Sequence, residues 1–244
     1  MTGPFRSFRP EVRRTLPLLV GFRMVSNAAF RYGFTFLPAL ASGSGLSIEA
    51  VGRLLSARDL TALAGPALGR RSDRTSTTKM MAITSAVLVS GLVVAAFGPV
   101  GLIVGFLMIG LGKLGYDVSM NAWIGEVVAY ERRGKATGLV ELSWAGSALL
   151  LLPIIGLLID RVDWWSASLF LAVLAAPMSL AISRQPSHQI KTGSAGAPAR
   201  MSIARSAMST LGAFALMSMS SQFLIVGHGV WLADTYGFDA VSYT

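Results

Sequence analysis

The sequence predicts an all-α, polytopic membrane helix bundle with seven spans. Its 244 residues are 53% hydrophobic and only 14% charged, with a mean hydropathy of +0.60. Crossing the hydrocarbon of a bilayer takes roughly 20 residues of helix, and several apolar stretches are that long. The lysines and arginines gather in alternate connections between those stretches, as they do in multi-pass membrane proteins. This composition excludes an ordinary soluble domain.

The predicted spans differ in whether they carry charge. Four of them contain no Asp, Glu, Lys or Arg, and they cover residues 80–98, 142–159, 164–183 and 206–233. Three more are long enough but have charges within them, at residues 16–40, 49–69 and 99–127. A short outer loop over residues 41–48 would join the first two spans. The first apolar stretch has the basic flank of a signal peptide, but it is too long for one, and we expect it to be retained.

A linker divides the predicted spans into six and one. Residues 184–205 are rich in Ser, Gly, Ala and Pro with scattered basic residues, which is typical of a flexible connection. The sequence therefore predicts a six-helix bundle over residues 1–183, a cytoplasmic linker over 184–205, and over 206–244 the first helix of an incomplete second bundle. We expect a partial chain, either truncated or split.

Positive charge sets the predicted orientation. Seven crossings place fifteen basic residues on one face of the membrane, while the opposite loops hold only Arg161. The fifteen are Arg6, Arg9, Arg13, Arg14, Arg70, Arg71, Arg74, Lys79, Arg132, Arg133, Lys135, Arg184, Lys191, Arg200 and Arg205. The positive-inside rule assigns that face and the N-terminus to the cytoplasm, and we expect the protein in the inner (plasma) membrane. Topology and anionic lipids thus account for the net charge of +9 without nucleic acid.

Two of the charged spans carry a polar residue at every fourth position. The two rows are Arg23, Asn27 and Arg31 in the first span, and Lys113, Asp117 and Asn121 in the fourth. Residues four apart stay on nearly one face of a helix, so each row forms a polar stripe. Hydrocarbon does not solvate such stripes, and a single charge at a helix centre costs about 2.5–3.5 kcal/mol. The stripes should therefore face each other or water.

The partners of the buried charges are open at this stage. Lys113 and Asp117 can neutralise each other as a structural ion pair, or they can bind a solute or a proton. Arg23 and Arg31 either find Asp59 or Asp117 across the bundle or present their charge to an anionic substrate. Side chains of the adjacent Arg58 and Asp59 should point about 100° apart, so we expect one of them to pair with another helix.

The sequence gives little support for a metal, nucleotide or catalytic site. The chain has no cysteine, its two histidines are far apart in sequence, and no phosphate-binding GKS or GKT motif occurs. We find no nucleophile, acid and base constellation, so we predict no catalytic residue, no metal site, no cofactor and no enzyme activity. The glycines between Gly101 and Gly115 indicate close helix packing. Gln222, in the last span, either lines a cavity or packs helices together.

The connections resemble those of the major facilitator superfamily. The segment GRRSDRTSTTK, starting at Gly69, is similar to the signature loop of that family, with Asp73 and Arg74 at matching places, although Ser76 replaces a glycine. The string YERRGKATG at residues 130–138 is similar to the equivalent loop of the same half. Pro153 and Gly156 resemble a motif associated with antiporters, with Leu152 in place of the expected glycine.

The resemblance covers residues 15 to about 240 and implies a fold and a set of sites. Members have two six-helix halves, and the first, fourth and seventh spans line a central cavity. The implied substrate and ion pathway comprises Arg23, Asn27, Arg31, Arg58, Asp59, Lys113, Asp117, Asn121 and Gln222. The implied cytoplasmic gating loops comprise Gly69, Asp73, Arg74, Glu126, Arg133, Gly134 and Glu141, with Glu126 or Glu141 as a partner for Arg74.

The resemblance implies a secondary active transporter of the efflux type, which moves a small solute by alternating access. A coupling ion, H⁺, and membrane lipids are the other expected partners, together with a second membrane chain that supplies the missing half. Two alternatives stay open: a seven-helix sensor or receptor, and a membrane assembly subunit without transport of its own.

Overall fold

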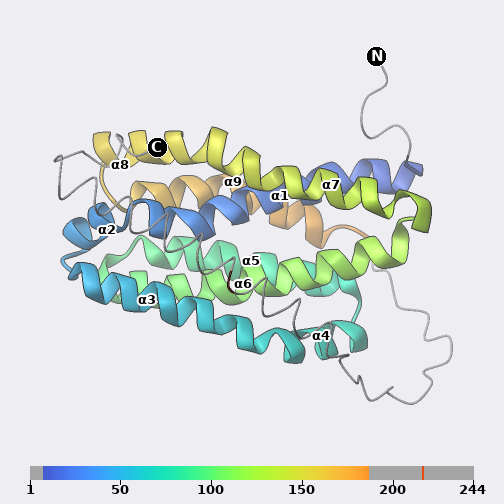
Figure 1. Ribbon diagram of the computed structural model, residues 1–244, viewed down its shortest axis with the longest axis horizontal. Helices are drawn as coiled ribbons and strands as arrows, with labels where there is room; N and C mark the ends of the chain where they lie inside the picture. Colours follow the sequence, from blue (N-terminus) through green and yellow to red (C-terminus); the bar gives the residue numbers. More distant parts are fainter. Residues whose placement is uncertain (1–7, 187–215, 217–244) are drawn as a thin grey trace.

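The computed structural model describes residues 8–186 and Leu216, and at Asp73 and Arg74 it describes the backbone alone. Within these residues the chain forms six segments that run back and forth along one axis (Figure 1). The first two are α1 (Pro10–Thr35) with α2 (Leu37–Ser44), and α3 (Ile48–Leu60) with the 3₁₀ turn η1 (Thr61–Ala64) and α4 (Gly65–Arg74). The next two are single helices, α5 (Thr77–Ala95) and α6 (Gly98–Val127). The last two are α7 (Tyr130–Gly146) with the π turn η2 (Ser147–Leu151) and α8 (Leu152–Arg161), and α9 (Ser166–Ser183).

Four stretches in the described part are long and apolar enough to cross a membrane, judged by length and composition alone. They are Thr77–Ala95, Gly98–Val127, Tyr130–Arg161 and Ser166–Ser183. The first two segments of the bundle are of similar length but contain charges or breaks in the helix. The all-helical bundle predicted from the sequence is therefore confirmed, while the seventh predicted span, at 206–233, lies outside the described residues apart from Leu216.

The connections are shorter than the sequence predicts. The loop expected at 41–48 is mostly helix, because α2 continues to Ser44 and the chain turns at Gly45, whose φ of 75° favours glycine. The predicted loop at 130–138 is also wrong, since α7 begins at Tyr130. Glu131 lies in the first turn of α7. An acidic side chain there interacts favourably with the positive end of the helix dipole and stabilises the start of the helix.

The fifth segment changes its winding in the middle. Pro153 has no backbone N–H, and its ring would clash with the carbonyl group four residues earlier in a regular α-helix. The helix widens into the π turn η2 just before this proline, and the N–H of Leu152 donates to the carbonyl oxygen of Ser147 instead. The proline thus explains the irregular turn.

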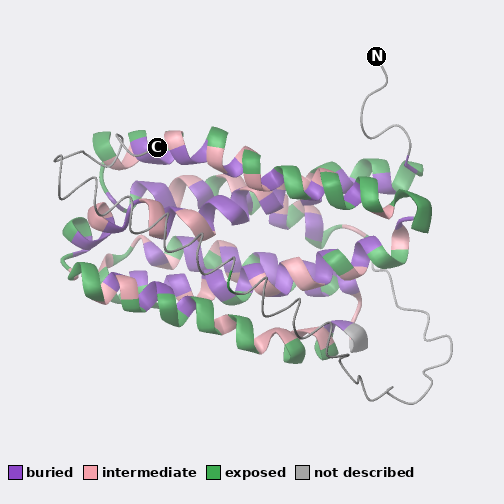
Figure 2. Cartoon of the chain, in the orientation of Figure 1, coloured by how far each residue is buried: buried purple, intermediate pink, exposed green. Residues whose placement is uncertain are grey.

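The core lies where the helices face one another. Buried positions recur along the helices where these pack together, and exposed positions gather on the outer helix faces (Figure 2). Helix α5 packs between α6 and α9, and α1 contacts α6, α7 and α9. Gly91 and Gly105 let α5 and α6 approach closely, because a Cβ at Gly91 would lie only 2.8 Å from the carbonyl oxygen of Gly105. The predicted packing role of the glycine series is confirmed at Gly105.

The ends of the bundle differ in charge. We call one of them the basic end, because the start of α1, the α4–α5 and α6–α7 connections and the end of α9 all lie there. Its described basic residues are Arg9, Arg13, Arg14, Arg70, Arg71, Lys79, Arg132, Arg133, Lys135 and Arg184. The antiparallel fold therefore gathers on one end the residues that the topology argument assigns to one face.

We expect Gly91→Ala to destabilise the protein by about 1–3 kcal/mol, because the new methyl group meets the backbone of α6, which has no room to give way. Thermal unfolding in detergent measures the effect. Gly138→Ala is the matched control, since a Cβ there has nothing within 4 Å. Equal stability of the two variants would contradict this close packing.

Candidate functional site

The two predicted polar stripes meet in the middle of the bundle. Asn27 lies midway between the ends of the first segment, residues 10 and 44, and Lys113 lies at the centre of α6, Gly98–Val127. The Nζ of Lys113 donates a hydrogen bond of 2.7 Å to the Oδ1 of Asn27. The contact joins α1 to α6 in the middle of the bundle.

Asp117 neutralises two cations at this point. Its Oδ2 accepts a hydrogen bond of 2.8 Å from the Nζ of Lys113, one helical turn away on α6. Its Oδ1 lies 3.4 Å from the Nε of Arg23 on α1, as an ion pair without hydrogen-bond geometry. The Arg23 and Lys113 side chains are only 9% and 8% exposed. Both cations therefore depend on this carboxylate.

A third helix, α7, completes the group. The Nη1 of Arg23 donates to the Oε1 of Glu141 at 2.9 Å, and the Nδ2 of Asn27 donates to the Oγ of Ser143 at 3.0 Å. We call Arg23, Asn27, Lys113, Asp117, Glu141 and Ser143 the central network. Glu141 is its most accessible charge, with 55% of the side chain exposed. Sequence reasoning missed Ser143, although it lies two residues after Glu141 in an otherwise apolar stretch.

Arg58 and Asp59 form a separate, closed site. The prediction that the two side chains point apart is wrong, because the long Arg58 side chain folds back and its Nη2 donates to the Oδ1 of Asp59 at 2.9 Å. The prediction that one of the two residues pairs with another helix is confirmed, because Arg58 also binds α1. The Nη1 of Arg58 donates to the carbonyl oxygen of Phe30 at 2.7 Å. The guanidinium carbon lies 3.6 Å from the ring centre of Phe30 and 4.7 Å from that of Phe34. Arg58 is fully buried and holds α3 to α1.

The remaining stripe residues lie beside the network. Arg31 is half-buried, and its guanidinium carbon lies 5.4 Å from the ring centre of Trp144 on α7. Among the described residues it forms no ion pair with Asp59 or Asp117, which pair with Arg58 and with Arg23 and Lys113. Asn121 is exposed, one turn beyond Asp117. The predicted pathway residue Gln222 lies outside the described residues.

The predicted gating residues lie on helices, so the expectation that they belong to loops is wrong, and all of them except Glu141 lie near the basic end. Gly69 is in α4, Glu126 in α6, and Arg133 and Gly134 in α7. Arg133 donates to the carbonyl oxygens of Val128 and Gly125 at the C-terminal end of α6. A cation at this place stabilises the negative end of the helix dipole.

The proposed partners of Arg74 have other contacts. Glu126 accepts a hydrogen bond of 3.1 Å from the Thr77 hydroxyl group, and Glu141 lies in the central network. The side chains of Asp73 and Arg74 themselves are outside what the structure describes.

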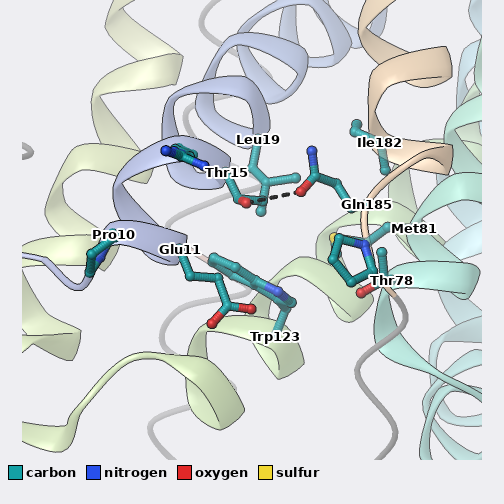
Figure 3. A pocket seen from close by; sticks show the side chains of 11 residues that line it. Pro10, Glu11, Thr15, Leu19, Thr78, Met81, Trp123, Ile182 and Gln185 are labelled. Atoms are coloured by element: carbon teal, nitrogen blue, oxygen red, sulfur yellow. Dashed lines mark hydrogen bonds between the residues drawn. The ribbon is translucent and has the colours of Figure 1, made fainter.

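A cavity of 480 Å³ opens near the basic end, and none of the residues predicted for the pathway lines it (Figure 3). The hydroxyl group of Thr15 donates to the Oε1 of Gln185 at 3.1 Å across it, which joins α1 to the residues after α9. The lining residues are Pro10, Glu11, Arg14, Thr15, Leu19, Thr78, Met81, Trp123, Ile182, Gln185 and Pro186. The cavity lies within one bundle and is separate from the central network.

We expect Asp117→Asn to lower the stability by about 3–5 kcal/mol, because it leaves Lys113 and Arg23 buried without their shared counter-charge. Glu141→Gln should cost about 1 kcal/mol or less, since that side chain is largely exposed. Thermal unfolding of the purified variants gives both values. A loss at Asp117 no larger than that at Glu141 would refute the shared role of this carboxylate.

A solved structure shares this fold. The crystal structure of a POT family transporter in complex with a thioalcohol-conjugated peptide is 13% identical in sequence to this chain and superposes with a TM-score of 0.61. The match covers 95% of this chain and 51% of that one, so this chain spans about half the length of the transporter it matches. No curated protein matches the chain.

The sequence itself matches a family model. The model of the Major Facilitator Superfamily covers residues 19–244, which is most of the chain. The resemblance in the connections and the helical bundle are thereby confirmed as features of one family. The chain belongs to the Major Facilitator Superfamily, whose members are multi-pass membrane transporters.

Proposed function

We propose that the chain serves secondary active transport of a small solute by alternating access, with protons as the coupling ion. The observation that carries the proposal is the central network at the middle of the first segment and of α6. Charged groups at bilayer depth are expensive unless they face a cavity or each other, and in membrane proteins they mark solute and ion pathways. The family match favours this function over a seven-helix sensor.

The network provides a way for a proton to change how helices are held. Arg23 of α1 lies between Asp117 of α6 and Glu141 of α7. A proton on Glu141 removes its negative charge and weakens the contact between α1 and α7, while Asp117 still holds Arg23 and Lys113. Proton occupancy would then bias two arrangements of the helices, which is what coupling requires.

The accessible side of the network belongs to the proposed pathway. Asn121 and Glu141 are exposed on α6 and α7, and the superfamily has its cavity between two six-helix halves. In the proposal a second bundle covers this side, either from a longer chain or from a second membrane chain. Export is the proposed direction, which rests on the likeness of Pro153 and Gly156 to the antiporter motif.

Alternating access predicts that one position is reached from both sides of the membrane. The chain has no cysteine, so a single introduced thiol reports alone. We expect Asn121→Cys to react with an impermeant maleimide in both right-side-out and inside-out vesicles, and Glu141→Gln to change the ratio of the two rates and its dependence on pH. Arg53→Cys, exposed on α3, is the control and should react from one side only. Reaction of Asn121→Cys from one side only would contradict the proposal.

The proposed orientation places the basic end in the cytoplasm. Ser42 and Lys79 are exposed at opposite ends of the bundle. On intact cells an impermeant maleimide should label Ser42→Cys and should label Lys79→Cys only after the cells are opened. The reverse pattern would invert the orientation.

A further inference from the structure

In the middle of the bundle, where α1, α6 and α7 meet, the described charged residues include one more cation than carboxylates. The cations are Arg23, Arg31 and Lys113, and the carboxylates are Asp117 and Glu141. Both carboxylates already contact Arg23, and Asp117 also binds Lys113. Arg31 is therefore the cation whose charge is left over.

The side chain of Arg31 is only half-buried and has no carboxylate partner among the described residues, whereas that of Arg58 is fully enclosed. Arg58 is fully buried and binds a carboxylate, a carbonyl oxygen and aromatic rings. The Arg31 guanidinium group lies against the ring of Trp144, at 5.4 Å. The Nζ of Lys113 lies at 5.4 Å from the same ring. Trp144 is thus a common neighbour of the leftover cation and of the paired one.

The depth of Arg31 makes a leftover charge significant. It lies four residues, about 6 Å of helix, from Asn27 at the middle of the first segment. A cation so far from the lipid headgroups needs a counter-charge or water. Guanidinium offers a planar fork of donors that fits the two oxygens of a carboxylate or phosphate group.

We infer that Arg31, with Trp144 beside it, binds the anionic group of the transported solute, so that the substrate class is a small carboxylate or phosphate ester. The inference rests on the proposed transport function. The indole ring offers an apolar wall next to the charge, which suits a solute with an apolar body attached to its acid group. Glu141 is left for the coupling proton.

The first test measures local charge with a single thiol. Thr35 lies one turn from Arg31 and is half-buried. In the purified full chain in nanodiscs, Thr35→Cys should react faster with the anionic sulfonatoethyl methanethiosulfonate than with the cationic trimethylammonium reagent. Adding Arg31→Gln should reduce this ratio about tenfold, Arg31→Lys should keep most of it, and Arg53→Gln, at an exposed ion pair, should leave it unchanged.

The second test asks whether a carboxylate occupies the site. Benzoate should slow the reaction of Thr35→Cys with the uncharged methyl methanethiosulfonate, and Arg31→Gln should abolish that protection. Benzamide, which has the same shape without the charge, should have no effect. The inference is overturned if benzoate does not protect, if benzamide protects equally, if Arg31→Gln leaves the charge ratio unchanged, or if the thiol is inaccessible to all three reagents.

These outcomes are separate from those of the transport proposal. Anion preference at Thr35→Cys together with labelling of Asn121→Cys from one side only would retain the anion site and reject alternating access. Two-sided labelling of Asn121→Cys without anion preference at Thr35→Cys would retain transport and reject a substrate anchored by Arg31.

Discussion

The carboxylate of Asp117 is the constraint on which the rest of the bundle depends. It lies near the middle of α6 and is shared by Lys113 on its own helix and Arg23 on α1. The cost of burying these two cations in the middle of the bundle is offset in large part by this shared counter-charge. Because Arg23 also binds Glu141, and Asn27 joins Lys113 to Ser143, the same set of bonds fixes the relative positions of three helices. The apolar contacts fill space around the network, and the polar ones select one arrangement of α1, α6 and α7.

The chain meets the problem of a buried cation in two different ways. Arg58 is enclosed by Phe30, Phe34 and its own neighbour Asp59, and Gly110 makes room for it, since a Cβ there would lie 2.7 Å from the Cγ of Arg58. That site is complete, and it holds α3 against α1. Arg31 has an aromatic neighbour on one side and no carboxylate in the described part of the chain. A closed site serves the fold, whereas an open one has capacity left for a ligand.

The sequence predicts that polar stripes on two helices meet, but it does not predict the individual contacts of the central network. Polar residues spaced by four in an apolar helix have to share a face, so the spacing alone indicates that Asn27 and Lys113 belong to stripes that seek each other or water. The spacing of the polar residues does not predict which carboxylate pairs with each arginine. That choice depends on the rotation and depth of three helices that are far apart in sequence. The prediction that the Arg58 and Asp59 side chains point apart is wrong for another reason: helix geometry fixes where a Cβ points, but an arginine side chain is long enough to turn back on itself. The role of Ser143 depends on long-range packing in the same way as the choice of carboxylate.

Irregular backbone lies on one side of the network in two of its three helices. The first segment breaks at Phe36, between α1 and α2, and the fifth widens at η2, Ser147–Leu151, and both points are nearer the end opposite the basic end. Sharp changes in helix direction concentrate at such points. The network therefore holds together the parts of α1 and α7 that lead toward the basic end. Helices α2 and α8 continue beyond the breaks, away from the network. Under the proposed alternating access, a change in protonation of Glu141 would shift the halves of α1 and α7 that lead toward the basic end. The breaks in the helices would let α2 and α8 keep their own packing during this shift.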